Sequence, residues 1–498
     1  MPANRKPAST TEAISKAATH QVSRRTLVKG AAGLGAAAAT SSVFSVPTIV
    51  GQEKTPVVFW TTFSADGLAN VTAIVDAFNA QSADVAVTIE QLPPAEVSDS
   101  SKLLTAVRGG TGPDIYHLDR FIVAERAGQG ALQDLTPLCE ANGIDPSLSD
   151  WVSFAAAEAL FNGAPYALPF DTDLRGVYYN RTLANTAGVD ISRMDPENGP
   201  ITWDAFFELA AQFDVTDANG NFTQMGFVPQ FGQSSPYTYG YSFGGNFMDW
   251  DNCQVTPDDP GVVAGGQLVY DYNQSKGPDK VQAFIQAATV VGAPPTESPF
   301  NQGRLAFLLS GDWELQSIPR YNPDMDFGVT YIPVPEEGAD PSTWAGGWST
   351  VIPQGAKQPE AAFQFMRFIC GAEGQRMYTI SSAHTPTLRS TFQDPSIFSE
   401  KHRFFIENLL NVTRTRPPLP VGAKYWDELQ AAQEKIALNL EDPATAFATV
   451  KANTQPLMDA FCPLSAPPQT EPIVVDFSGV QATPGASPSS SPAATPAT

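Results

Sequence analysis

Strand and helix patterns alternate over residues 55–119, and this alternation constrains the fold more than any other feature of the sequence. The segments TPVVFW, ADVAVTIEQL and DIYHLD are apolar or alternating runs that predict strands. Between them, GLANVTAIVDAFNAQS carries apolar residues at helical spacing, and a second helix around Leu103 and Val107 ends at Gly109. The order β-α-β-α-β predicts a parallel sheet, with binding sites beyond the carboxyl ends of its strands.

Further patterns continue this α/β character toward the C-terminus. ITWDAFFELAAQF predicts a helix capped by Thr202, and RLAFLLSGDWELQSI predicts a buried strand, a turn at Gly311 and a helix beginning near Trp313. MDFGVTYIPVP and GGWSTVIP predict two strands, while PEAAFQFMRFICGAEGQRMYTI and YWDELQAAQEKIALNL predict amphipathic helices. The Gly- and aromatic-rich stretch from Gly226 to Trp250 predicts irregular structure around a pocket.

The composition excludes several functions. The 498 residues leave room for a large core and about two or three domains. A formal charge of −23 repels phosphate backbones, so we expect no nucleic-acid partner. The four cysteines show no CxxC or Cys/His spacing, so we expect no metal site and no cofactor; outside the cytosol they can pair in three ways, and buried free thiols are the alternative.

Both ends of the chain differ from the rest. VSRRTLVKGAAGLGAAAATSSVF, within residues 1–51, resembles a twin-arginine export signal, and a plain basic arm is the alternative reading. We therefore expect an exported protein, periplasmic or extracellular and cell-surface associated, with no cysteine at the usual lipid-anchoring position. Residues 463–498 are rich in Pro, Ser, Ala and Thr, which predicts a flexible tail.

The segment LPFDTDLRGVYYN, residues 168–180, holds the most suggestive acids. In a strand, Asp171 and Asp173 project from one face about 6.6 Å apart, near the spacing of a glycosidase carboxylate pair. A catalytic centre, a ligand clamp and a crossing between domains are all consistent with it. Motifs of the types HExxH, GxSxG and GxxxxGK[ST] are missing from the sequence, so we favour a binding protein over a secreted glycosidase or lyase that uses these two acids.

The chain is rich in groups that suit a polar, uncharged ligand. Sugar rings stack on aromatic faces, and their hydroxyls pair with carboxylate and guanidinium groups. Candidate aromatic platforms are Trp313, Trp344, Trp348, Trp426, Tyr116 and Tyr425, and candidate polar groups are Asp119, Arg120, Asp171 and Asp173.

Five segments in order resemble the extracellular solute-binding proteins of ABC transporters, in the carbohydrate-binding group (family 1) that includes maltose-binding protein. They are TGPDIYHLDRF, NGAPYALPFDTDLRGVYYN, FNQGRLAFLLSGDWELQSI, DFGVTYIPVP and GGWSTVIPQGAKQPEAAFQFMRFI, and the resemblance reaches about Phe461. It implies the two-lobed periplasmic-binding-protein fold, each lobe a mainly parallel sheet flanked by helices, with a ligand cleft between the lobes.

The resemblance also implies how the chain divides. Crossings are expected at residues 168–174, at 329–334 and near His384 to Leu388. The N-terminal lobe then comprises residues 56–169 and 333–384, and the C-terminal lobe comprises residues 174–329 and 388–462.

The resemblance further implies ligand-binding roles for individual residues. Asp119 matches an acid that binds sugar hydroxyls, Asp173 and Asp171 match the acid of the first crossing, and Trp313 matches a stacking tryptophan. The remaining implied contacts are Tyr116, Arg120, Gly347, Trp348, Arg416 and Trp426. The loop TTFSADG lacks the charged pair of maltose-binding protein, so maltose itself is not implied.

The function implied is capture of a mono- or oligosaccharide by hinge closure and its delivery to transmembrane permease subunits. The expected partners are the carbohydrate, the permease and the twin-arginine export machinery, and the chain is expected to be a monomer. Polyols and glycerol-phosphate compounds are alternative ligands, although three acids facing each other disfavour an anion.

Overall fold

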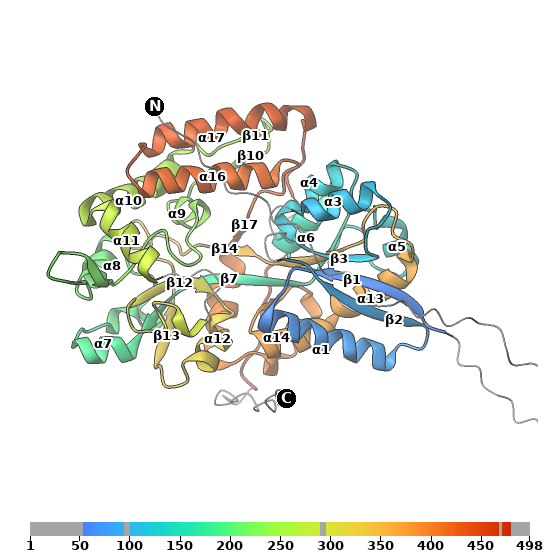
Figure 1. Ribbon diagram of the computed structural model, residues 1–498, viewed down its shortest axis with the longest axis horizontal. Coiled ribbons are helices and arrows are strands. Elements are labelled where there is room, and N and C mark those ends of the chain that lie inside the picture. The colour runs from blue at the N-terminus through green and yellow to red at the C-terminus, as the bar shows by residue number, and fades with distance from the viewer. Residues whose placement is uncertain (1–52, 94–99, 289–294, 468–470, 480–498) are drawn as a thin grey trace, which may run out of the picture. The chain divides into compact units, whose positions relative to one another are not determined.

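The computed structural model describes residues 53–93, 100–288, 295–467 and 471–479, which belong to one compact unit (Figure 1). The predicted export signal and the last residues of the tail lie outside this part of the chain. No helix in the described part is long and apolar enough to span a membrane.

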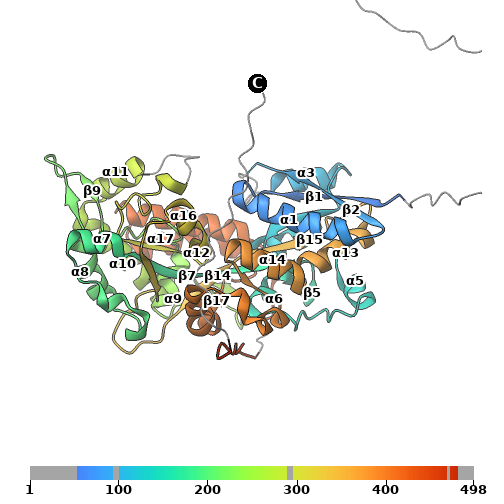
Figure 2. The same ribbon diagram turned by 90° about the horizontal axis from the view of Figure 1, so that it is seen from below.

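The first sheet contains the predicted β-α-β-α-β segment. Its strand order is β2 (Val85–Gln91), β1 (Thr55–Thr61), β3 (Ile115–Asp119), β15 (Trp348–Val351) and β6 (Leu168–Pro169). β1 pairs in parallel with β2 and β3, which confirms the prediction, whereas β15 runs antiparallel to β3 and β6. The helices α1 (Ala65–Gln81), α13 (Pro359–Ile369) and α14 (Ala372–Ser382) pack beside it, as Figure 2 shows.

The second sheet is built around β7 (Asp171–Asn180), a strand of 10 residues that are all buried. Its partners are β12 (Phe307–Gly311), β13 (Phe327–Thr330), β14 (Thr343–Gly346) and β16 (Thr385–Pro386), with β17 (Thr413–Thr415) beside β14. All four strands that pair with β7 run antiparallel to it, and only β17 is parallel to its neighbour. The expectation of a mainly parallel sheet is wrong for the second sheet. The chain enters this sheet along β7, and the four strands that pair with β7 run in the opposite direction.

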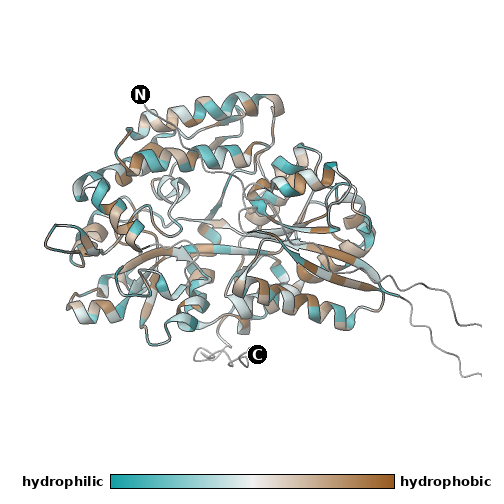
Figure 3. Ribbon diagram, viewed as in Figure 1, coloured by the Kyte–Doolittle hydropathy of each residue, from teal (hydrophilic) through white to brown (hydrophobic). Residues whose placement is uncertain are grey.

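Helices enclose the second sheet, and its core is separate from that of the first. The predicted cap Thr202 accepts a hydrogen bond from the Ala205 N–H at the start of α8 (Trp203–Ala211). Figure 3 shows the apolar strands at the centre of both sheets.

The stretch from Gly226 to Trp250 is less irregular than predicted, because it contains the helix α9 (Pro236–Ser242). The helices around the second sheet are α7 (Arg181–Ala187), α8 (Trp203–Ala211), α9 (Pro236–Ser242), α10 (Pro260–Lys276), α11 (Pro278–Ala288), α12 (Glu314–Tyr321), α16 (Gly422–Ala437) and α17 (Pro443–Met458).

Shorter elements connect these layers. Helix α3 (Ser101–Arg108) precedes β3, and α4 (Val123–Gly128), α5 (Thr136–Ala141) and α6 (Ser153–Ala159) follow it. Small hairpins are formed by β4 (Leu160–Phe161) with β5 (Ala164–Pro165), β8 (Val215–Thr216) with β9 (Phe222–Gln224), and β10 (Met248–Asp249) with β11 (Gln254–Val255); α15 (Glu400–Phe404) lies near the C-terminus.

The strand pairing locates where the chain passes from one sheet to the other. Phe170 separates β6 in the first sheet from β7 in the second, and Gly347 separates β14 in the second from β15 in the first. Residues 333–346 were expected in the N-terminal lobe, but Thr343–Gly346 form β14 of the second sheet, where Ala345 lies opposite Leu174. The return passage is thus at 346–348 rather than 329–334, and the division into two lobes stays a prediction.

The C-terminal region is more ordered than its composition predicts. A disulfide joins Cys253 to Cys462, and Cys139 and Cys370 are buried free thiols. Ile473 and Asn411 exchange two hydrogen bonds, of 2.8 and 2.9 Å, and Phe477 is only 9% exposed. The prediction of a flexible tail is therefore wrong for residues 471–477, where apolar side chains in the run EPIVVDF supply the packing.

Candidate functional site

Five of the predicted residues meet where the chain passes between the sheets. Asp119 ends β3 directly opposite Trp348, the first residue of β15. The Trp348 N–H donates to Asp171 Oδ1 over 2.6 Å, and the Gly346 N–H donates to Asp173 Oδ1 over 2.7 Å. Gly347 lies between these two donors. Strand pairing therefore brings segments that are far apart in the sequence to one junction.

Arg120 connects the two segments of this junction through hydrogen bonds from its buried side chain. Its side chain is fully buried and donates to the carbonyl oxygens of Asp171 and Gly346, and its Nε contacts Glu158 Oε2 at 3.0 Å. Gly347 has φ +126°, and a Cβ there would lie 2.5 Å from the Asp171 carbonyl oxygen, so only glycine fits. Arg120 thus has a structural role in place of the predicted ligand contact.

Tyr116 is also a buried residue next to the site and not an exposed ligand contact. It is 1% exposed and belongs to the core of the first sheet, beside Trp60 across the β1–β3 pair. Tyr116 was predicted to contact the ligand, but it lies three positions before the end of β3, where the strand is covered on both sides. Tyr425 and Trp344 are likewise buried.

Arg416 connects Asp119 to a buried acid that sequence analysis missed. Arg416 contacts Asp119 Oδ1 at 2.9 Å through a terminal nitrogen and Glu158 Oε1 at 3.1 Å through Nε. Burial alone would lower the pKa of Arg416, but the two carboxylates outweigh it and raise the pKa. The only sequence signal for Glu158 is a single acid within the apolar run FAAAEALF.

A second ion pair joins Asp173 to Arg175, also missed as a site residue. The Arg175 guanidinium pairs with Asp173 Oδ1 and lies 3.6 Å from the ring centroid of Trp344. Burial alone would raise the pKa of Asp173, but Arg175 and other cations lower it below its ordinary value. Asp173 is therefore a carboxylate whose charge is already balanced.

Asp171 differs from Asp119 and Asp173 because it forms no ion pair with an arginine side chain of the described residues. It is 1% exposed, and its Oδ2 has no hydrogen-bond partner among the described residues. His384 Nε2 lies 4.0 Å away, but burial lowers the pKa of that imidazole to about 4, so it is neutral at pH 7. Burial, reinforced by the negative charges of Asp173 and Asp119, raises the pKa of Asp171 to about 8 although the Trp348 N–H opposes the shift. Asp171 is therefore mainly protonated at neutral pH. A protonated Asp171 adds no negative charge to the group, which weakens the argument from three charged acids against an anionic ligand.

Trp313 lies beside these acids, as predicted. It precedes α12 and is half-buried, and its ring stacks on His384 with 5.6 Å between centroids and 25° between planes. The ring lies over Gly311, where any side chain would collide with it. Arg175 is 5.9 Å from its centroid. His384 is thus a further candidate that was predicted only to mark a crossing.

Trp426 lies near Arg416 rather than near Trp313. It is half-buried on α16, and its ring centroid is 5.5 Å from that of Phe121 and 5.9 Å from that of Tyr237. The candidate site therefore has two groups, one around Asp173 and Trp313 and one around Asp119 and Arg416. Among the described residues, no group of His, Cys, Asp or Glu could hold a metal ion.

This fold and junction define a two-sheet solute-binding protein. The chain belongs to the family of bacterial extracellular solute-binding proteins, whose sequence profile matches residues 64–376. A galactooligosaccharide-binding protein of Bacillus subtilis is 20% identical over 374 residues, which cover 73% of this chain and 81% of that protein. An arabinooligosaccharide-binding protein of Halalkalibacterium halodurans is 25% identical over 389 residues, covering 73% and 80%.

Solved structures show the same fold. CpMnBP1 with mannotriose bound has a TM-score of 0.69 at 22% identity, covering 80% of this chain and all of that one. Maltose-bound MalE3 of T. maritima has a TM-score of 0.64 at 22% identity, covering 81% and 99%. The fold class predicted from the sequence is confirmed in its α/β two-sheet form. The chain is accordingly a binding protein and not an enzyme.

Proposed function

We propose that this protein is the oligosaccharide-binding component of an ABC transporter, which captures its ligand outside the cytoplasm by hinge closure and delivers it to the permease. The family and the relatives support this role. The observation that carries it is the set of charge-balanced polar groups beside half-buried tryptophans at the junction of the sheets.

Asp119, Asp173, Trp313 and Trp348 are the ligand contacts we favour. The two carboxylates are held by Arg416 and Arg175, so they are pre-oriented acceptors for sugar hydroxyls. The indole rings offer faces for the C–H side of a pyranose or furanose ring. This combination suits a neutral polyhydroxylated ring better than a hydrophobic solute.

The way the chain passes between the sheets supports hinge closure. In this proposal, residues 170–172 and 346–348 are hinge strands, and the N-terminal and C-terminal lobes rotate about them when a ligand contacts both. The permease would recognise the closed form. We also propose that residues 1–51 direct export through the twin-arginine route, and that the mature protein acts as a monomer.

A thermal-shift screen tests the ligand class. The panel comprises mannobiose, mannotriose, maltose, galactooligosaccharides, arabinooligosaccharides and, as the anionic alternative, glycerol phosphate. A ligand at 100 times its Kd should stabilise the fold by about 2.7 kcal/mol. Stabilisation by glycerol phosphate alone would contradict the carbohydrate proposal.

Two measurements on the best ligand complete the test. Small-angle scattering should show a smaller radius of gyration with ligand than without it, and an unchanged value would contradict hinge closure unless the apo form is already closed. Mass spectrometry of the incubated mixture should return the ligand intact, and conversion abolished by Asp173→Asn would instead indicate a glycosidase.

A further inference from the structure

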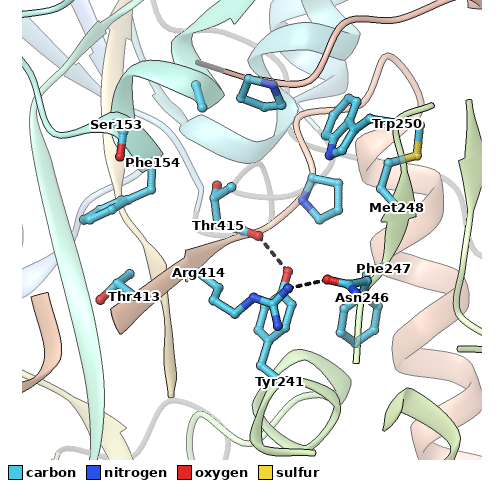
Figure 4. A pocket seen from close by; sticks show the side chains of 13 residues that line it. Ser153, Phe154, Tyr241, Asn246, Phe247, Met248, Trp250, Thr413, Arg414 and Thr415 are labelled. Atoms are coloured by element: carbon cyan, nitrogen blue, oxygen red, sulfur yellow. Dashed lines mark hydrogen bonds between the residues drawn. The ribbon is translucent and has the colours of Figure 1, made fainter. Parts of the chain in front are cut away.

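A pocket, which we call the β17 pocket, lies beside the candidate carbohydrate site, because its lining residues Thr415 and Pro417 flank Arg416 in the chain. It has a volume of about 240 Å³, and none of the ten predicted ligand contacts lines it. Figure 4 shows Ser153 and Phe154 of α6 on one side, Met248 and Trp250 on the other, and Arg414 of β17 with Tyr241 between them.

Among the described residues that line this pocket, Arg414 is the one that carries a charge. One terminal nitrogen donates to the Gly245 carbonyl oxygen over 3.0 Å, and the other donates to Asn246 Oδ1. Its guanidinium lies 4.4 Å from the ring centroid of Tyr241. These contacts fix the side chain, but all of them are neutral.

Arg416, two residues further along the chain, differs from Arg414 in the charge of its partners. Arg416 contacts two carboxylates, whereas Arg414 forms no ion pair with any carboxylate of the described residues. The chain has 52 acidic residues for 29 basic ones, so acids are plentiful. Two of the five N–H groups of Arg414 are used by the two hydrogen bonds, which leaves donors for an incoming acceptor.

The other lining residues and the volume of the pocket limit the size and chemistry of a ligand that could bind there. The aromatic and other apolar residues Phe154, Phe247, Met248 and Trp250 line the cavity, and so do Ser153, Thr413 and Thr415. The hydroxyls of Thr413 and Thr415 donate to the carbonyl oxygens of Leu409 and Arg416. The cavity is larger than the roughly 150 Å³ that holds benzene and smaller than a typical drug site. One ring with one charged group therefore fits.

We propose that the β17 pocket binds a small ring-bearing monocarboxylate, with its carboxylate on the Arg414 guanidinium and its ring against the apolar walls. Planar guanidinium groups pair with carboxylates through two parallel hydrogen bonds, and the fixed orientation of Arg414 lowers the ordering cost of binding. Such a ligand is either a sugar acid or an aromatic acid. The β17 pocket and the candidate carbohydrate site share no predicted contact residue, so the two proposals can fail separately.

Calorimetric titration of the full-length protein with matched acid and neutral probes tests the proposal. Glucuronate is paired with glucose, and benzoate with benzyl alcohol. At least one acid should bind saturably and its neutral counterpart roughly tenfold or more weakly, because a charge-assisted contact is lost. The acid that binds identifies the source. Equal affinity within both pairs, or no binding by either acid, would overturn the proposal.

Substitution of Arg414 locates the site. Arg414→Gln should abolish the preference for the acid, and Arg414→Lys should keep only part of it because the planar donor pair is lost. Arg304→Gln is the matched control, since Arg304 also lies over an aromatic ring and donates to a neutral carbonyl, but away from the pocket. Loss of the preference in the control would overturn the assignment to Arg414.

A crystal structure of the wild type soaked with 4-iodobenzoate gives a test that needs no variant. The iodine signal should lie in the β17 pocket, with the carboxylate within hydrogen-bonding distance of Arg414. If benzoate is the acid that binds in the titration, iodine found only at other positions would overturn the proposal. If glucuronate is the acid that binds, the crystals are soaked with glucuronate instead, and its density found only outside the β17 pocket would overturn the proposal.

Discussion

Glu158→Gln tests whether the buried charge network holds the junction together. Glu158 has no exposed surface, and each of its oxygens contacts a different arginine. Oε2 lies 3.0 Å from Arg120 Nε, and Oε1 lies 3.1 Å from Arg416 Nε. Both arginines are themselves buried, at 0% and 4% exposure. One carboxylate in α6 is therefore the shared counterion of two cations.

The expected cost follows from what glutamine offers in its place. Glutamine provides one acceptor oxygen and an NH₂ group, so one Nε–H faces a donor and both arginines lose this counterion. Removing one partner of a buried ion pair costs about 3–5 kcal/mol. Arg416 keeps Asp119, and Arg120 keeps its backbone carbonyl partners, so the protein should still fold.

Urea unfolding followed by circular dichroism at pH 7 measures this loss. The matched control is Glu441→Gln, which breaks a surface ion pair with Lys435 at 2.9 Å and should cost about 1 kcal/mol or less. A Glu158→Gln variant within about 1 kcal/mol of the wild type would refute the view that Glu158 is a necessary counterion.

Three further predictions concern the ligand, the pH and the C-terminus. Trp313→Ala should weaken carbohydrate binding by roughly 2 kcal/mol or more in calorimetry, with little change in melting temperature; a collapse of the melting temperature would make Trp313 a core residue. Because the pKa of Asp171 is raised from 3.8 to about 8, the folded form holds its proton more tightly and loses stability as the pH rises through this range. Asp171→Asn should therefore reduce the loss of unfolding free energy between pH 5 and pH 8, and an unchanged loss would contradict the assignment. Truncation after Leu464 should destabilise the protein by roughly 1.5–3 kcal/mol, the value of burying one large side chain such as Phe477, whereas truncation after Gly479 should not; equal melting curves would show that the packed segment adds nothing.

Local patterns in the sequence predicted much of the fold. The alternating segments of residues 55–119, the Thr202 cap and the turn at Gly311 are all present, because each depends on side chains within a few positions of one another. The direction of the second sheet depends on how β7 pairs with strands up to more than 200 residues away. No local period carries that information, and it was predicted wrongly.

The candidate site shows the same limit. Asp119 is the last residue of β3, Asp173 lies near the start of β7, and Trp313 directly precedes α12, and these positions were recognisable. Glu158 and Arg175 acquire their roles only through partners brought close by folding, so neither stood out. Arg120 resembled a ligand contact because it adjoins Asp119, but its side chain turns to the interior, where backbone carbonyls accept from it.

The position of β15 has a consequence for how the chain is made. This strand lies between β3 and β6, yet it ends 182 residues after β6 (from residue 169 to residue 351). At about 5–20 residues per second, a ribosome needs roughly 9–36 s to synthesise that interval. During this time the edges of β3 and β6 have no partner in their own sheet, while the strands of the second sheet emerge. An N-terminal fragment that stops before β15 therefore cannot complete the first sheet, whose five-stranded form requires residues from both sides of the second sheet in the sequence.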